Sequence, residues 1–192
     1  NASFPMTGAT HTVNSTLAIG SLTIARGSFD PGSGLTKEIG TTGYTFSGLR
    51  LTAGTNEDVF VKALQWNQSG SAGLADLTNV KVVLDGVTYD ASSSDGKDYI
   101  AKFGDGLKIE KGLNKEVYIK ADIAGGSART VDFDLFRYSD IQVVGLTYGY
   151  ALLPSGTETT ANNNDDGGIQ DAEPRFDAYQ AHIGAGTINA QN

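Results

Sequence analysis

The sequence predicts an all-β protein: an antiparallel β-sandwich or jelly roll with an extended N-terminal strand arm. Apolar and polar residues alternate in short runs, and turn signals that contain glycine separate these runs about every ten residues. Nowhere do apolar residues keep a helical spacing over the length that a stable helix needs. Short strands spaced in this way are typical of sandwiches and jelly rolls.

The first run, residues 11–26, reads as a strand that has no hairpin partner in the sequence. Its apolar residues are Val13, Leu17 and Ile19 on one face and Leu22 and Ile24 on the other. The face changes at Gly20, where a bulge costs little. A terminal strand with apolar residues on both faces needs a sheet to join, which is either its own or that of a neighbouring copy.

The following runs predict the strands of the core. Residues 59–66 read as a strand buried on both sides, and Trp66 fits its apolar pattern as a core residue rather than a sugar-stacking platform. Residues 80–84 lead into Asp85-Gly86, the strongest hairpin signal of the chain. Further strands are expected at 44–51, 99–109, 117–123 and 141–150.

Residues 131–135 alternate three apolar side chains with Asp132 and Asp134. Residues two apart on a strand share a face, so these carboxylates have the proximity of a glycosidase pair. We interpret them instead as the solvent-facing side of an amphipathic strand.

The chain divides into three parts. Residues 1–41 form the N-terminal arm, a candidate donor strand followed by a linker, and residues 42–153 form the sandwich core. Residues 154–192 begin with a flexible acidic loop and end with a strand-like piece, residues 176–188.

Composition excludes several classes of function. The chain has 192 residues and 14 basic against 22 acidic side chains, and its net charge of −8 disfavours nucleic acid and anionic membrane surfaces as partners. It has no cysteine, so disulfides and zinc–thiolate sites are impossible. No apolar run reaches the ~20 residues of a membrane-spanning helix, so membrane insertion is not expected. The chain begins at Asn1 without Met, which we interpret as a mature exported product or a fragment.

Catalytic signals are weak. The two histidines, His11 and His182, both lie outside the core, and the chain contains no G-x-S-x-G motif. We therefore predict that the protein is not an enzyme.

One stretch has the spacing of a calcium-binding loop. Asn162, Asn164 and Asp166 stand at alternate positions before a glycine, and Glu173 follows at the distance of a closing bidentate ligand. We nevertheless favour a solvated acidic linker, because Asn162 replaces the usual first Asp and the flanking residues do not look helical. No other cofactor is expected.

Three N-x-S/T sequons occur, at Asn1, Asn14 and Asn67. Each is a candidate glycosylation site if the producing cell modifies asparagine. Chance also supplies such triplets readily in a chain rich in Asn, Ser and Thr.

Several turns carry a family resemblance across residues 17–150. The motif residues are Asn56-Glu57-Asp58, Asn79-Val80, Asp85-Gly86, Lys111-Gly112, Lys115 and Ala121-Asp122-Ile123. This pattern resembles the β-sandwich domains of bacterial surface-layer and adhesin-type repeat proteins and of pilus-like fibre subunits, many from uncultured bacteria. The resemblance implies an extracellular structural role at the cell surface.

Pattern and resemblance together predict a non-enzymatic subunit of an extracellular filament or surface layer. Each copy would insert its N-terminal strand into a neighbour's sandwich, so the partner is the protein itself. The donor side chains would be Val13, Leu17, Ile19, Leu22 and Ile24. The alternative is a monomeric adhesive module that binds cell-surface carbohydrate, with the same arm paired inside its own sheet.

Overall fold

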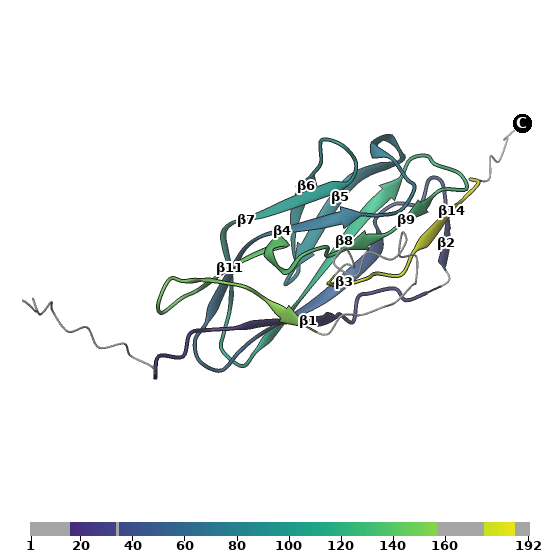
Figure 1. Ribbon diagram of the computed structural model, residues 1–192. Helices are drawn as coiled ribbons and strands as arrows, with labels where there is room; N and C mark the ends of the chain where they lie inside the picture. Colours follow the sequence, from purple (N-terminus) through teal and green to yellow (C-terminus); the bar gives the residue numbers. More distant parts are fainter. Residues whose placement is uncertain (1–15, 34, 157–174, 187–192) are drawn as a thin grey trace, which may run out of the picture.

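The computed structural model describes residues 16–33, 35–156 and 175–186, and it confirms the all-β prediction. A large curled sheet and a small second sheet make up these parts of the chain (Figure 1). The large sheet consists of β1 (Leu22–Arg26), β3 (Tyr44–Ala53), β4 (Val59–Gln68), β5 (Leu77–Leu84), β6 (Val87–Ser92), β7 (Asp98–Ile109), β8 (Asn114–Ile123), β10 (Phe133–Asp134), β11 (Ile141–Gly145), β12 (Ala151–Leu152) and β13 (Ser155–Gly156). The small sheet consists of β2 (Leu35–Glu38), β9 (Thr130–Val131) and β14 (Ala181–Gly184).

The large sheet curls to form a sandwich-like body. Its strand order is β12-β11-β4-β7-β6-β5-β8-β3-β1-β13, with β10 added on β4. The two ends of this order, β12 and β13, are almost consecutive in sequence, so one short segment connects opposite edges of the curled sheet. All pairings in this sheet are antiparallel except that of β1 with β13.

Aromatic side chains fill the interior. The rings of Phe46 and Tyr99 pack against Phe133, with centroids 5.8 and 5.4 Å away. Trp66 is completely buried, which confirms its interpretation as a core residue. The predicted hairpin is also present, because Asp85 and Gly86 both have positive φ angles (50° and 80°), as a tight turn between β5 and β6 requires.

The N-terminal strand joins the sheet of its own chain. β1 pairs with β3 over its whole length, and Leu22 and Ile24 are buried in the core. In this structure the two side chains thus fill the core of their own chain and not pockets of a neighbour. Glu57 accepts a hydrogen bond from the N–H of Gly20, and the chain then lies along β3.

The small sheet lies at the opposite end of the molecule from the segment that leads into β1 (Figure 1). In it β14 is central, parallel to β2 and antiparallel to β9. β2 is thus an outer strand in the described part of this sheet. Among the described residues, no helix has the length and apolar character needed to cross a membrane.

Candidate functional sites

The first candidate site is the start of the described chain. Leu17 and Ile19 are 43% and 44% exposed, although both are large and apolar. Val13, the remaining predicted donor residue, lies outside the described residues. The predicted donor strand is thus divided at Gly20, with exposed apolar residues before it and core residues after it.

Glu57 attaches this segment to the body. Its carboxylate accepts hydrogen bonds from the backbone N–H groups of Gly20 (2.7 Å), Thr147 (2.7 Å) and Tyr148 (3.2 Å). Burial alone would raise the pKa of Glu57, but these hydrogen bonds outweigh burial and hold the pKa below its ordinary value. A single buried carboxylate therefore joins the arm to the turn between β11 and β12.

The neighbours of Glu57 complete this attachment. Asn56 donates from its side-chain amide to the carbonyl of Ile19 (3.0 Å). Asp58 accepts from the backbone of Lys111 (2.9 Å) and pairs with Lys108 (2.8 Å). The Asn-Glu-Asp motif of the family resemblance thus has a physical role, which is to fix the arm and two turns at one end of the molecule.

The two segments that Glu57 joins both carry exposed apolar side chains, which we call the end patch. Its members are Leu17, Ile19, Leu146, Tyr148 and Tyr150. Their exposed fractions lie between 43% and 55%. Apolar side chains gathered in this way often mark a surface that another molecule covers.

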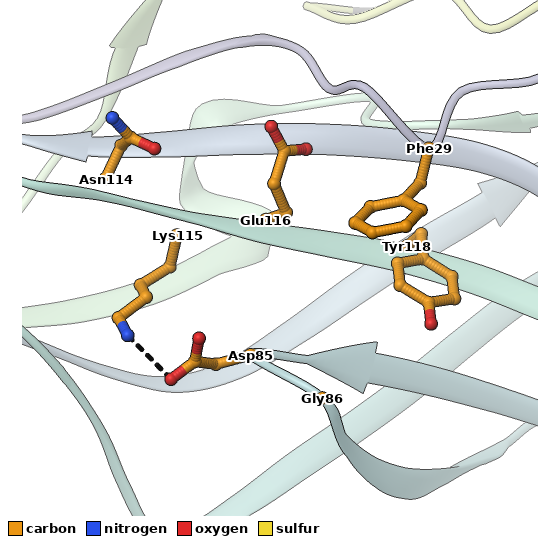
Figure 2. A pocket seen from close by; sticks show the side chains of 7 residues that line it. All are labelled: Phe29, Asp85, Gly86, Asn114, Lys115, Glu116 and Tyr118. Atoms are coloured by element: carbon orange, nitrogen blue, oxygen red, sulfur yellow. Dashed lines mark hydrogen bonds and ion pairs between the residues drawn. The ribbon is translucent and has the colours of Figure 1, made fainter.

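The second candidate site is an open hollow of about 370 Å³ between β8, the β5–β6 hairpin and the segment after β1. Phe29 and Tyr118 form its aromatic side, with ring centroids 4.6 Å apart (Figure 2). Lys115 reaches across to Asp85 at 2.7 Å. The other lining residues are Gly86, Asn114 and Glu116. Aromatic faces beside polar side chains are chemically suited to a sugar ring, which has apolar faces and a rim of hydroxyl groups.

The third candidate site is a buried group of carboxylates, Asp132, Asp134 and Asp177, which we call the acidic cluster. One carboxylate oxygen of each lies within 4.8 Å of the others. Asp132 and Asp134 are only 3% exposed, and Asp177 is half-buried. Asp134 accepts from the Ser69 hydroxyl (2.6 Å) and from the backbone N–H of Ala178 (2.8 Å).

The prediction that Asp132 and Asp134 face solvent is wrong. The alternation itself is real, because Phe133 points into the aromatic core while the two aspartates point to the other face. That other face is covered by the C-terminal segment, whose Phe176 exchanges two backbone hydrogen bonds with Leu135 (3.0 and 3.1 Å). A segment more than forty residues downstream therefore buries a face that is polar in sequence.

Arg26 of β1 holds the C-terminal segment in this position. Its guanidinium donates to the carbonyl of Asp177 (2.6 Å) and lies over the rings of Phe176 (4.8 Å) and Tyr179 (4.4 Å). The same guanidinium pairs with Asp30 (2.8 Å). Among the described ion pairs, Arg26 thus pairs with Asp30 and not with Asp132 or Asp134 of the acidic cluster.

Electrostatics in the acidic cluster favour a retained proton. Burial, followed by the charges of Asp134 and Asp177, raises the pKa of Asp132 to about 9. Burial also raises the pKa of Asp134 to about 6, although hydrogen bonds from Ser69 and Ala178 oppose that rise. Burial and the neighbouring carboxylates thus favour the protonated form of Asp132 when no cation is bound.

Most of the other predicted sites are not described. Asn1, Asn14, His11 and the predicted calcium ligands Asn162, Asn164, Asp166 and Glu173 all lie outside the described residues. Asn67 is half-buried at the end of β4 and donates to Asp98 (3.0 Å). His182 is exposed on β14.

No protein-family model matches the sequence, and no curated protein resembles it. The resemblance to bacterial surface proteins thus stays a prediction.

Solved structures give matches of low similarity. One is a family 123 glycoside hydrolase from Clostridium perfringens (13% identity, TM-score 0.36). The alignment covers 86% of this chain but only 27% of the hydrolase. Another is the ASH/PapD-like domain of human CEP192 (14% identity, TM-score 0.27), and the alignment covers 97% of this chain and 100% of that domain. A third is AvmM, which catalyses macrocyclization in alchivemycin A biosynthesis (9% identity, TM-score 0.33). This alignment covers 90% of this chain and 92% of AvmM.

The glycoside hydrolase among these matches corrects one prediction. The sequence led us to exclude enzymatic activity, and a match to part of an enzyme contradicts that exclusion. At a TM-score of 0.36 the match assigns no activity to this chain either.

Replacement of Glu57 by Gln tests its role in attaching the arm. We expect Glu57→Gln to lower the free energy of unfolding by about 2–4 kcal/mol at pH 7, because an amide cannot satisfy all three N–H groups as a carboxylate does. The pKa of Glu57 is lowered in the fold, so its contribution is present at neutral pH and is lost as the pH falls through that lowered value.

Denaturant titrations at pH 7 and pH 3 measure both effects. Glu110→Gln, at a largely exposed side chain, is the matched control and should be near neutral. Equal stability of wild-type protein and Glu57→Gln at pH 7 would contradict the assignment.

Proposed function

We propose that this protein is a structural subunit of an extracellular bacterial filament or surface layer, in which the N-terminal segment of each copy adds a strand to the next. The observation that carries the proposal is the position of the two ends. The segment that leads into β1 lies at one end of the molecule, and the outer strand β2 lies at the other (Figure 1). This segment carries the exposed residues Leu17 and Ile19.

Strand addition suits these features. An extended peptide that pairs with an outer strand gains backbone hydrogen bonds, and its alternate side chains give specificity. Leu17 and Ile19 are two residues apart, so on an extended chain they present one apolar face. Contacts between different ends do not close into a ring when copies are related by translation along the long axis, and they therefore build a fibre.

The donor that we propose is shorter than the whole N-terminal arm. Because Leu22 and Ile24 belong to the core of their own domain, the donor consists of residues before Gly20, with Val13, Leu17 and Ile19 as its apolar side chains. The domain keeps its own β1 when the donor is occupied elsewhere. Assembly and folding of the domain are thus separable.

Removal of residues 1–19, which carry all three proposed donor side chains, tests the proposal. We expect the truncated protein to keep its melting temperature, because β1 and Glu57 are intact, but to form no filaments. Electron microscopy and light scattering of the purified protein measure assembly, and thermal unfolding measures folding.

A pair of point variants sharpens this experiment. Leu17→Asp should weaken assembly strongly, whereas Ala18→Asp adds the same charge to the opposite face of the extended segment and should have a smaller effect. Filaments of normal length from the truncated protein would overturn the proposal.

One observation favours a second function, carbohydrate binding in the hollow between Phe29 and Tyr118. Tyr118→Ala should lower the affinity for a bound oligosaccharide about tenfold or more, through loss of the stacking face. A glycan array identifies the oligosaccharide, and titration calorimetry measures the affinity. Tyr150→Ala, at an exposed tyrosine of the end patch, is the control. Absence of any glycan ligand, or equal affinity of Tyr118→Ala, would contradict this function.

A further inference from the structure

We propose that the acidic cluster of Asp132, Asp134 and Asp177 binds a divalent cation of the calcium type inside the domain. This inference goes beyond the proposed assembly and does not depend on it. It also differs from the predicted calcium loop at residues 162–173, which shares no residue with the cluster.

The first argument is convergence. Asp132 and Asp134 share one face of an extended segment, and Asp177 reaches them from the C-terminal segment that covers this face. Three carboxylate oxygens within 4.8 Å of one another, from two separate segments, form the core of a cation site. Hard divalent cations such as Ca²⁺ take oxygen ligands of this kind.

The second argument is an unsatisfied oxygen. Oδ1 of Asp132 is buried and has no hydrogen-bond partner in the described structure. A buried carboxylate oxygen without a partner is costly, and native structures normally satisfy such atoms with a donor, water or ion. Oδ1 belongs to a member of the acidic cluster, and a cation bound there would satisfy it.

The third argument is the charge balance. Among the described ion pairs, none involves Asp132 or Asp134, and the adjacent guanidinium of Arg26 is paired with Asp30. Asp134 already accepts from Ser69 and Ala178, which fix the orientation of its carboxylate. A divalent cation would therefore balance charge in a group of carboxylates that are already oriented.

A cation at this position would have a structural effect. It would bind Asp134 of β10 and Asp177 of the C-terminal segment at once, and so would hold that segment over the face that it buries. Any cation that binds only the folded state raises the melting temperature with its concentration.

Thermal unfolding of the full chain tests the proposal, with Ca²⁺ as the probe against EGTA and with Mg²⁺ at equal ionic strength for comparison. At about a hundredfold excess over Kd we expect Ca²⁺ to raise the melting temperature by roughly 5–10 °C. Asp132→Asn should abolish this rise. Asp105→Asn, at a residue outside the cluster, is the matched control and should retain it.

Two further variants keep the test decisive. Asp177→Asn alters the half-buried member, so it should fold even if Asp132→Asn does not, and it should also lose the Ca²⁺ effect in calorimetric titration. Asp166→Asn should leave the effect unchanged. No rise with Ca²⁺ in the wild-type protein, a rise that persists in Asp177→Asn, or one that only Asp166→Asn removes would overturn the proposal.

Discussion

The fold depends on the packing of the C-terminal segment against the acidic face of residues 132–134. Arg26 of β1 donates to the carbonyl of Asp177, and the next residue, Ala178, donates to Asp134 of β10. These two hydrogen bonds join the beginning, middle and end of the described chain. The same packing buries two carboxylates and so raises their pKa values, and the segment continues into β14, the central strand of the small sheet.

This contact also decides which part of the N-terminal arm is available to another molecule. Arg26 is the last residue of β1, so the guanidinium that holds the C-terminal segment also anchors β1 beside it. Glu57 fixes the chain at a second point, Gly20, shortly before β1 begins at Leu22. Leu22 and Ile24 are therefore buried within their own domain, whereas Leu17 and Ile19, before Gly20, remain exposed.

Strand alternation and turn chemistry predicted the fold class and the Asp85-Gly86 hairpin, because both are encoded within a few residues. They could not predict whether the aspartate face of residues 131–135 is exposed to solvent, since Phe176 and its neighbours cover this face from a distant part of the chain. The same limit applies to β1. Its apolar residues are equally suited to its own sheet and to a neighbour's, and only its pairing with β3 distinguishes the two.

The central claim, that copies join end to end through the N-terminal segment, is tested most directly by cross-linking between two variants. The chain has no cysteine, so Val13→Cys and Thr36→Cys each introduce a single thiol, one on the donor and one on β2. If the donor of one copy lies along β2 of the next, as proposed, mild oxidation of the mixed variants should yield a disulfide-linked pair. Val13→Cys mixed with Asp105→Cys is the control, and its yield of mixed dimer measures random collision. An equal yield from Val13→Cys mixed with Thr36→Cys would contradict the claim.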